Sequence, residues 1–571
     1  MPAPNAAALL RRNASDRGIR ERPAVKFGDR VWTHGEYVAE ASRWSRLFLA
    51  RAPAERPLHV GVLLDNTPDY LFALGGAALA GAAVVGLNHT RRDEHLLRDI
   101  THTHVGVIVT EPRHQELLEP IADRLPTEPD NLLVSTRFVD DGDPVPALGK
   151  PLDDALAAVP GDDPGLEPDA DTLWGLIFTS GTSAAPKAVV CSQRRFMVTG
   201  NRMGMIMELG PDDVGYVCMP LFHSNALMVG WAPSIVYGAC VGLARKFSAS
   251  RWLPDVRRYG ATYFNYTGKP LAYLLSTPER PDDRDNPLRV AFGNEGSPEV
   301  VDAFSRRFGV DVVDAYGATE GGVAVDRDAE ERAGALGKVA PAVKVVDEDG
   351  NEKPRARFDD QGHLVNAEDC VGEIVNTAGA GPFEGYYNNP EANEQTLRFG
   401  WYWTGDLGYL DADGYLYFAG RNADWLRVDG ENFPAGPIEA ALGHHPEVVL
   451  AAVYGVPDDQ AGDQVMAGLV LRDGAAFDPA GFASWIDGQD DIGPKWRPRY
   501  VRIMNDPPTT GTNKIVKRAL VHQKWRDDRV GDDQIYVRGR GEPAFRAFTP
   551  EDEQALNESF VHYQRERFWD L

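Results

Sequence analysis

The sequence predicts an α/β protein in which a large N-terminal α/β domain of several subdomains, one of them β-rich, precedes a small mobile α+β domain. Two observations support this fold class. Up to Tyr316, short runs rich in β-branched residues alternate with helical stretches, which is typical of mostly parallel sheets covered by helices. From Lys344 the strands shorten and Gly/Asp turns multiply, and near Arg421 the pattern changes a second time.

The predicted elements of the large domain alternate along the chain. Strands are expected at His59–Leu64, Ala82–Leu87, Val105–Thr110, Leu173–Phe178, Ala188–Cys191, Leu288–Phe292 and Val310–Tyr316. Helices are expected at Asp69–Ala80, Arg194–Met207, Leu271–Leu275 and Glu299–Phe308. The shorter strands that follow include Val371–Asn376 and Tyr415–Ala419.

At 571 residues the chain is too long for one hydrophobic core, so two or more domains are expected. We assign residues 1–420 to the N-terminal domain, with the β-rich subdomain at about 335–420, and residues 421–571 to the C-terminal domain with its tail. A hinge is expected near 421–424. The C-terminal domain should contain a helix at Pro437–Leu442 and strands at Val448–Val456, Gln464–Val470 and Tyr500–Met504.

Composition and charge exclude several classes of protein. Hydrophobic residues make up 43% of the chain and charged residues 25%, as in folded soluble proteins. The net charge of −26 disfavours nucleic acid, or an anionic membrane, as a large-surface partner. The four cysteines lie far apart without paired spacing, which indicates a reducing compartment and a cytoplasmic location, and argues against a zinc site.

One apolar segment has the length of a membrane span. Tyr70–Leu87 carries no charged residue over about 18 positions, close to the length that crosses a bilayer. The segment is rich in Gly and Ala, however, and the basic stretch Asn88-His-Thr-Arg-Arg92 follows directly. A buried helix running into a buried strand gives the same pattern, and we expect this second arrangement.

The most informative stretch is Ile177-Phe-Thr-Ser-Gly-Thr-Ser-Ala-Ala-Pro-Lys-Ala188. A buried strand ends here in a loop rich in backbone N–H and hydroxyl donors, which suits a phosphate chain, and the lysine adds a point charge. The spacing is not that of a Walker loop, and an ordinary Ser/Gly turn would have a similar composition. The candidate phosphate ligands are Thr179, Ser180, Gly181, Thr182, Ser183 and Lys187.

Further motifs follow in a fixed order. They are Pro220-Leu-Phe-His-Ser-Asn225, Gly293-Asn-Glu-Gly296, Asp314-Ala-Tyr-Gly-Ala-Thr-Glu-Gly321, Trp403-Thr-Gly-Asp-Leu407, Gly420-Arg-Asn-Ala-Asp424, Gly430-Glu-Asn432 and Thr510-Gly-Thr-Asn-Lys514. Over roughly residues 20–540 this series resembles the adenylate-forming superfamily of acyl-CoA synthetases, luciferases and peptide-synthetase adenylation domains. One motif could arise by chance, but the ordered set is specific.

The resemblance implies a site for ATP and Mg²⁺. Tyr316 resembles the aromatic residue on which adenine stacks, and Asp314, where relatives usually have asparagine, can accept from the adenine amino group. Glu320 would hold Mg²⁺, a hard cation that suits carboxylate and phosphate oxygens, and Thr319 would donate to a phosphate oxygen. Asp406 resembles the carboxylate that accepts from the ribose hydroxyls. The remaining implied nucleotide contacts are Gly293, Asn294, Glu295, Ala315, Gly317 and Arg421.

The resemblance also implies catalytic groups outside the nucleotide motifs. Lys514 resembles the lysine that bridges the carboxylate substrate and the α-phosphate, where a cation offsets the repulsion between two anions. His223 matches the residue that gates the acyl pocket, although a lone histidine is more often structural. The CoA-binding and hinge candidates are Ala423, Gly430, Glu431 and Asn432. Alanine at 184, 188 and 423 departs from the usual pattern of the family.

We therefore expect an ATP-dependent fatty acyl-CoA synthetase that forms acyl-AMP and pyrophosphate, and then acyl-CoA and AMP, with rotation of the C-terminal domain between the two half-reactions. Ala261–Leu275 and Asp532–Val537 resemble the fatty-acid-transport-protein and very-long-chain acyl-CoA synthetase branch. The expected partners are a fatty acid or similar small carboxylate and CoA, with no nucleic acid; peripheral membrane contact and a monomer or homodimer are compatible with the sequence. The alternatives are an acyl-AMP ligase that loads a carrier protein, and an inactive protein that binds acyl groups or nucleotides.

Overall fold

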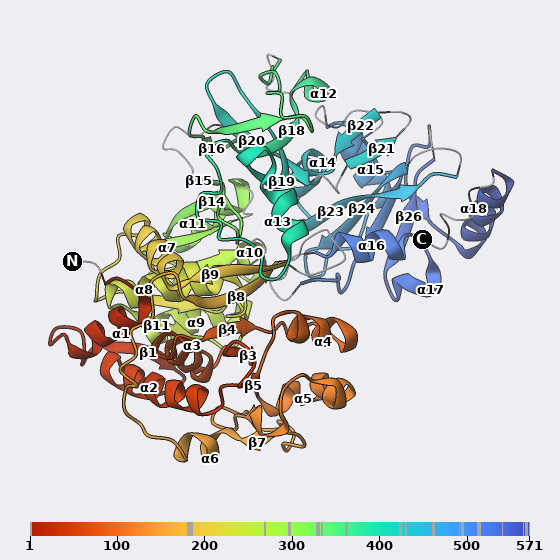
Figure 1. Cartoon of the computed structure of the whole chain (residues 1–571). Helices are drawn as coiled ribbons and strands as arrows, with labels where there is room; N and C mark the ends of the chain where they lie inside the picture. Colours follow the sequence, from red (N-terminus) through yellow and green to blue (C-terminus); the bar gives the residue numbers. More distant parts are fainter. Residues whose placement is uncertain are drawn as a thin grey trace. The chain divides into compact units, whose positions relative to one another are not determined.

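The structure is a computed structural model whose parts are shown in Figure 1. It describes residues 3–179, 187–267, 270–294, 298–326, 332, 335–359, 364–421, 425–428, 431–459, 463–489, 492, 496–510, 515–539, 541–563, 565 and 569. Two compact units are present: the first comprises Met1–Ala324 with Ala380–Gln395, and the second comprises Val325–Gly379 with Thr396–Leu571. The hinge near 421–424 stays a prediction, because residues 422–424 lie outside the described ranges.

The first unit contains a seven-stranded sheet in the order β7-β6-β5-β3-β4-β8-β9. Its strands are β3 (His59–Leu63), β4 (Ala83–Gly86), β5 (Val107–Thr110), β6 (Leu132–Val134), β7 (Lys150–Pro151), β8 (Leu173–Thr179) and β9 (Lys187–Ser192). All neighbours pair in parallel except β8 and β9, which are antiparallel. The predicted strands of this region and their parallel arrangement are confirmed.

A second sheet of eight strands has the order β15-β14-β13-β12-β10-β11-β1-β2. Its strands are β1 (Pro23–Phe27), β2 (Arg30–Thr33), β10 (Val214–Val217), β11 (Cys240–Leu243), β12 (Tyr263–Thr267), β13 (Val290–Asn294), β14 (Asp311–Gly317) and β15 (Ala324–Asp326). Strands β12, β13 and β14 are parallel neighbours, so their carboxyl ends lie at one edge of the sheet.

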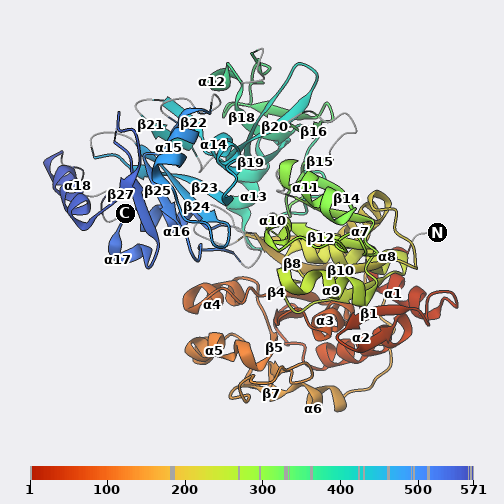
Figure 2. The same ribbon diagram turned by 180° about the vertical axis from the view of Figure 1, so that it is seen from behind.

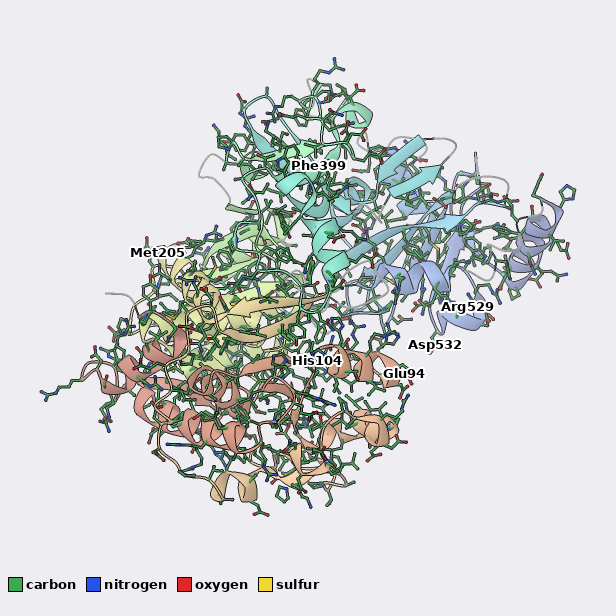
Figure 3. The ribbon with its side chains drawn as sticks, in the orientation of Figure 1. Glu94, His104, Met205, Phe399, Arg529 and Asp532 are labelled. Atoms are coloured by element: carbon green, nitrogen blue, oxygen red, sulfur yellow. The ribbon has the colours of Figure 1, made fainter. Side chains whose placement is uncertain are left out.

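Helices cover these two sheets. They are α1 (Ala6–Ser15), α2 (His34–Ala50), α3 (Pro68–Ala80), α4 (Asp93–His102), α5 (Gln115–Leu118), α6 (Leu152–Ala157), α7 (Gln193–Ile206), α8 (Ala232–Tyr237), α9 (Ala249–Tyr259), α10 (Pro270–Ser276) and α11 (Pro298–Phe308). Helices α7 and α8 lie side by side in both views, next to α1 (Figures 1 and 2). Met205 lies on the outward face of α7 and is 58% exposed (Figure 3).

The apolar segment Tyr70–Leu87 forms a buried helix and a buried strand. All residues of α3 are buried, and the helix ends at Gly81, which adopts a positive φ of 66°. Gly75 and Gly76 permit close packing on α2, because a Cβ atom there would lie 2.6 Å from the Tyr37 hydroxyl and 2.7 Å from the Trp44 Cβ. None of the described helices is long and apolar enough to cross a bilayer.

The second unit begins with a five-stranded antiparallel sheet in the order β16-β20-β19-β18-β17. Its strands are β16 (Ala335–Lys338), β17 (Val343–Val346), β18 (Gly372–Asn376), β19 (Tyr402–Leu410) and β20 (Tyr415–Arg421). The short helix α12 (Ala367–Cys370) precedes β18, whereas α13 (Pro390–Thr396), which precedes β19 in the chain, belongs to the first unit up to Gln395. This sheet confirms the predicted change to short strands and turns.

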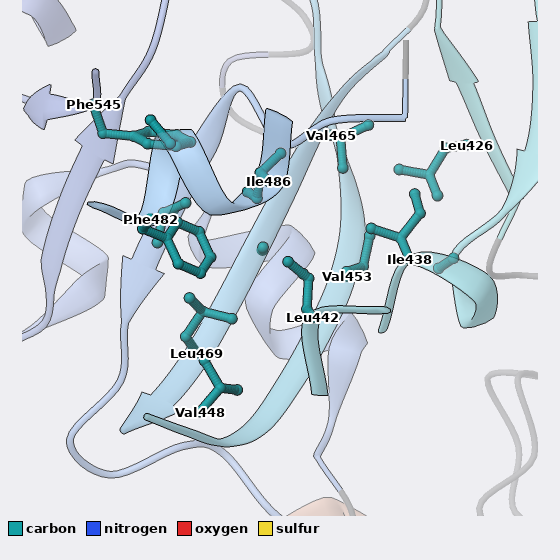
Figure 4. Close-up of a cluster of buried hydrophobic side chains, with 14 of the residues drawn as sticks. Leu426, Ile438, Leu442, Val448, Val453, Val465, Leu469, Phe482, Ile486 and Phe545 are labelled. Atoms are coloured by element: carbon teal, nitrogen blue, oxygen red, sulfur yellow. The ribbon is translucent and has the colours of Figure 1, made fainter. Parts of the chain in front are cut away.

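The C-terminal part of the second unit is an α+β arrangement, as predicted. Its elements are the hairpin β21 (Trp425–Val428) and β22 (Glu431–Pro434), the sheet β23 (Val448–Pro457), β24 (Asp463–Leu471), β25 (Tyr500–Ile503), β26 (Gln534–Val537) and β27 (Arg546–Ala547), and the helices α14 (Gly436–Gly443), α15 (Pro479–Asp487), α16 (Lys517–Gln523), α17 (Asp527–Val530) and α18 (Pro550–His562). Ile438 and Leu442 of α14 and Phe482 and Ile486 of α15 pack on the sheet in a buried core (Figure 4).

Candidate active site

Residues from the two sheets of the first unit meet at Glu320. Strand β8 ends at Thr179, and the hydroxyl of Thr179 lies 3.5 Å from the Glu320 Oε1 atom. Glu320 follows β14 and is 9% exposed. The hydroxyl of Tyr386 donates a hydrogen bond of 2.8 Å to the same Oε1 atom. Both hydroxyls therefore contact one carboxylate oxygen, and Oε2 accepts no hydrogen bond from the described residues.

An arginine of α7 supports the backbone around Glu320. Arg195 is 7% exposed, and its Nη2 atom donates to the carbonyl oxygens of Thr319 and Glu320, the latter at 2.9 Å. Its Nη1 atom donates to the carbonyl of Val190 in β9 at 2.8 Å. One guanidinium thus ties the segment after β14 to strand β9, whose first residue is Lys187.

The Thr319 side chain joins this segment to the motif that contains His223. The Ser224 and Thr319 hydroxyls lie 2.7 Å apart, within hydrogen-bond distance. His223 is half-buried, and its ring centroid is 4.6 Å from that of Phe222. A π-helix, η4 (Asn225–Trp231), begins directly afterwards, and π-helical turns occur frequently at functional sites.

The predicted adenine-binding residues lie at the carboxyl ends of β13 and β14. Asp314 is 8% exposed and accepts a hydrogen bond of 2.6 Å from the Tyr266 hydroxyl. Gly293 leaves no room for a side chain, since a Cβ atom would lie 2.5 Å from the Tyr266 carbonyl oxygen. Asn294 and Tyr316 are half-buried at the ends of their strands. Ala315 is buried and Gly317 is exposed.

Lys187 lies close to the same cluster. It pairs with Thr179 in the β8–β9 ladder, so the phosphate-loop candidate begins and ends at adjacent positions. Its ammonium lies 5.0 Å from the centroid of the Tyr386 ring, a distance typical of a cation–π contact. The structure therefore brings together Thr179, Lys187, Thr319 and Glu320. The contact between Thr179 and Glu320 joins residues that are 141 positions apart in the sequence.

The predicted ribose-binding residues belong to the second unit. Asp406 of β19 and Arg421 of β20 are opposite each other in the antiparallel ladder. Asp406 is 8% exposed, and its backbone N–H donates to the Thr404 hydroxyl at 3.0 Å. Glu431 and Asn432 lie in strand β22. The candidates that fall outside the described residues are Ser180, Gly181, Thr182, Ser183, Glu295, Ala423, Gly430 and Lys514, and their roles stay predictions.

Three residues of this cluster were not predicted from the sequence. Ser224 follows His223 within one of the motifs, so its position carried a signal. Tyr386 belongs to the aromatic pair after Gly385, and Arg195 belongs to the basic pair after Gln193. Neither pair differs in composition from an ordinary surface segment. Their contacts with Glu320 span 66 and 125 residues, so only the folded chain reveals them.

Comparison with known proteins identifies the class. Residues 10–387 match the family model of the AMP-binding enzymes, and residues 437–514 match that of the AMP-binding enzyme C-terminal domain. The chain therefore belongs to the AMP-binding enzyme family, and the resemblance to the adenylate-forming superfamily is confirmed.

Individual relatives within this family are CoA synthetases and CoA ligases. The chain is 46% identical over 561 residues to a steroid-22-oyl-CoA synthetase of Rhodococcus jostii (strain RHA1), with 97% of each chain covered. It is 45% identical to the medium/long-chain-fatty-acid–CoA ligase FadD17 of Mycobacterium marinum, covering 88% of this chain and 93% of the relative. The crystal structure of the anthranilate CoA ligase AuaEII with anthranoyl-AMP shares the fold, with a TM-score of 0.78 at 22% identity over 91% of this chain and 97% of that one.

Proposed function

We propose that the protein is an ATP-dependent acyl-CoA synthetase for large apolar carboxylic acids. The observation that carries the proposal is the identity of 46% across 97% of the steroid-22-oyl-CoA synthetase, together with the similar identity to a medium/long-chain-fatty-acid–CoA ligase. The first relative is named for steroid-22-oyl-CoA and the second for medium- and long-chain fatty acids. We infer a substrate of medium or greater length, with steroid side-chain acids included.

The described part of the site fits a magnesium ion bound with ATP. Mg²⁺ is usually held by one or two carboxylates together with substrate phosphates, and it requires oxygen ligands. Glu320 offers one carboxylate oxygen, Oε2, that accepts no hydrogen bond from the described residues, while two hydroxyls hold Oε1. Glu320 would therefore hold the ion through Oε2. When bound, Mg²⁺ would offset the negative charge of the phosphates.

The first half-reaction joins the substrate carboxylate to the α-phosphate and releases pyrophosphate. Lys187 and the loop that begins at Thr179 would grip the β- and γ-phosphates. Thr319, which contacts the Ser224 hydroxyl, would donate to an oxygen of the phosphate or acyl phosphate. Lys514 would reduce the repulsion between the incoming carboxylate and the α-phosphate. Tyr316 would stack on adenine, and Asp406 would accept from the ribose hydroxyls.

The second half-reaction transfers the acyl group to the thiol of CoA and releases AMP. Rotation of the C-terminal domain near 421–424 would withdraw Lys514 and bring Gly430, Glu431 and Asn432 toward the thiol. His223, which lies beside Phe222 and before the π-helix, would gate the acyl pocket between these steps.

The test measures pyrophosphate release with a series of carboxylic acids from acetate to long-chain fatty acids, and with a steroid side-chain acid, each with and without CoA. We expect release with the large apolar acids, little with acetate, and conversion to the thioester when CoA is present. Pyrophosphate formation without CoA consumption would instead support loading of a carrier protein. ATP binding without any pyrophosphate release would show that the chain is catalytically inactive.

A further inference from the structure

Tyr386 lies in the segment of the first unit that returns after residue 380, and this segment pairs with strand β9. Its backbone forms a bridge with Val189, and the flanking hydrogen bonds join Val190 to Gly385 at 2.9 Å and Tyr387 to Ala188 at 2.8 Å. The side chain is 6% exposed, so its ring is held in place by the strand and by its surroundings.

The side chain of Tyr386 contacts two groups of opposite charge. Its hydroxyl donates to the Glu320 carboxylate at 2.8 Å, and its ring centroid lies 5.0 Å from the Lys187 ammonium. The Phe383 ring packs edge-on against the Tyr386 ring, with the two centroids 4.9 Å apart. The hydroxyl and the ring face therefore contact different partners, and the hydroxyl contact can be removed while the ring contact is kept.

These contacts matter because a lysine and a glutamate this close to a common neighbour could pair with each other. A direct ion pair would neutralise both groups, and ATP and its metal ion would have to break it before binding. No ion pair between Lys187 and Glu320 occurs in the described structure. A ring face attracts an ammonium without neutralising it, and a hydroxyl donor leaves a carboxylate fully charged.

We propose that Tyr386 is a positioning residue for adenylation, which keeps the phosphate-binding Lys187 and the metal-binding Glu320 apart and separately oriented. This inference rests on the proposed function for the roles of those two residues. Tyr386 itself touches neither substrate nor metal in this assignment. Its hydroxyl contacts the Glu320 Oε1 atom, which leaves Oε2 as the carboxylate oxygen that would hold the ion.

Two substitutions of Tyr386 distinguish the hydroxyl contact from the ring contact, and a third substitution, at Tyr387, provides a matched control. Tyr386→Phe removes the hydroxyl and keeps the ring, whereas Tyr386→Leu removes both. Tyr387→Phe removes a hydroxyl from the adjacent residue. That hydroxyl lies 2.8 Å from His104 Nδ1, and no nucleotide-binding role is assigned to either residue. Binding of α,β-methylene-ATP is measured by titration calorimetry over a range of Mg²⁺ concentrations. Pyrophosphate exchange, and thioester formation from supplied acyl-AMP, are measured alongside.

For Tyr386→Phe we expect the Mg²⁺ concentration needed for half-maximal analogue binding to rise about tenfold, since a hydrogen bond to a charged group is lost. Metal-free binding of the analogue should not change. Tyr386→Leu should in addition weaken metal-free binding about threefold, through loss of the cation–π contact. Thioester formation from acyl-AMP should stay within about twofold for both variants, because CoA transfer needs neither contact.

The proposal is overturned if Tyr386→Phe has the same Mg²⁺ requirement as Tyr387→Phe, or if both half-reactions slow equally in the Tyr386 variants. The proposed function has a separate failure. If the unmodified protein shows no pyrophosphate exchange with any acid, the synthetase assignment is lost, while the calorimetric titration still decides whether Tyr386 orients Glu320 and Lys187.

Discussion

Two buried carboxylates of the first unit have different surroundings. Glu320 receives hydroxyl contacts, whereas Asp99 of α4 is 1% exposed and neither of its oxygens has a hydrogen-bond partner in the described structure. Among the described residues, the Nε atom of Arg91 lies 3.6 Å from Oδ2 as an ion-pair partner. Burial raises the pKa of Asp99 to about 7, because the charged form loses its hydration. Asp99 is therefore a cost to stability at neutral pH and above.

This pKa predicts a pH-dependent effect of Asp99→Asn. The folded-state pKa lies above the value of about 4 expected in the unfolded chain, so the folded protein binds an extra proton between these values. Stability is lost as the pH rises through this window. We expect Asp99→Asn to be more stable than the unmodified protein by about 1–2 kcal/mol at pH 8, and similar to it at pH 4. Thermal unfolding at both values checks this.

The exposed Glu94 on the same helix provides the control (Figure 3). Glu94→Gln removes a surface charge and should change the free energy of unfolding by less than about 0.5 kcal/mol at either pH. Equal stabilisation by Asp99→Asn at both pH values would contradict the raised pKa.

Lys514 is the residue whose removal should separate the half-reactions. Lys514→Ala is expected to reduce pyrophosphate-forming adenylation by a factor of about 100 or more, since it removes a cation from the transition state. Conversion of supplied acyl-AMP and CoA to the thioester should persist, because the lysine is not needed for thiol attack. Single-turnover measurements of both steps test this. Persistent adenylation would show that the role assigned to Lys514 is wrong.

At the scale of elements, the edge formed by β12, β13 and β14 depends on close strand contact. Gly293 of β13 pairs with Tyr266 of β12, and any Cβ atom would meet the Tyr266 carbonyl. Since that obstacle is backbone, it cannot rotate away as a flexible side chain could. The same tyrosine donates to Asp314 of β14, so a shift of β12 would also move the predicted adenine-binding residue.

We therefore expect Gly293→Ala to destabilise the protein by about 1–3 kcal/mol, as overpacked substitutions do. It should also raise the KM for ATP, because Asp314 is displaced. Urea unfolding and steady-state kinetics measure the two effects. Gly210→Ala is the comparison, as a Cβ atom there would meet nothing within 4 Å. A variant at 293 that behaves like the one at 210 would refute the packing argument.

At the scale of the whole molecule, each compact unit has hydrophobic cores of its own. In the second unit one core includes Trp525, Phe560 and Trp569. Through this core, side chains near the C-terminus pack against residues of the sheet β23–β26 and of helix α16. The Lys524 ammonium, in a residue only 2% exposed, donates to the Trp569 carbonyl at 3.2 Å. The tail is thus part of the core of this unit.

Two compact units with separate cores predict two calorimetric unfolding transitions. Trp569→Ala should lower the stability of the second unit by about 3 kcal/mol, as expected for loss of a large buried aromatic side chain, and leave the first unit's transition in place. Differential scanning calorimetry makes the measurement. Tyr563→Ala, at an exposed position nearby, should shift neither transition by much. A single transition that moves as a whole in Trp569→Ala would contradict independent unfolding.

The sequence predicted the α/β class and several elements with close bounds. Helix α3 was expected at Asp69–Ala80 and begins at Pro68, and α7 was expected at Arg194–Met207 and occupies Gln193–Ile206. Strands β10 and β11 were not predicted, because apolar runs of four residues have too short a pattern to separate strand from helix.

For the site, the resemblance carried by the ordered motifs predicted nucleotide-binding roles for Thr179, Lys187, Thr319 and Glu320, and the folded chain brings these residues together. The amino-acid sequence by itself therefore determined the family and the kind of fold, and it predicted the polar residues of the nucleotide site. Only the tertiary structure decided that Arg195 supports the Glu320 backbone and that Tyr386 stands between Glu320 and Lys187. The physical reason is that these contacts join segments far apart in the chain, and local patterns carry no information about such contacts.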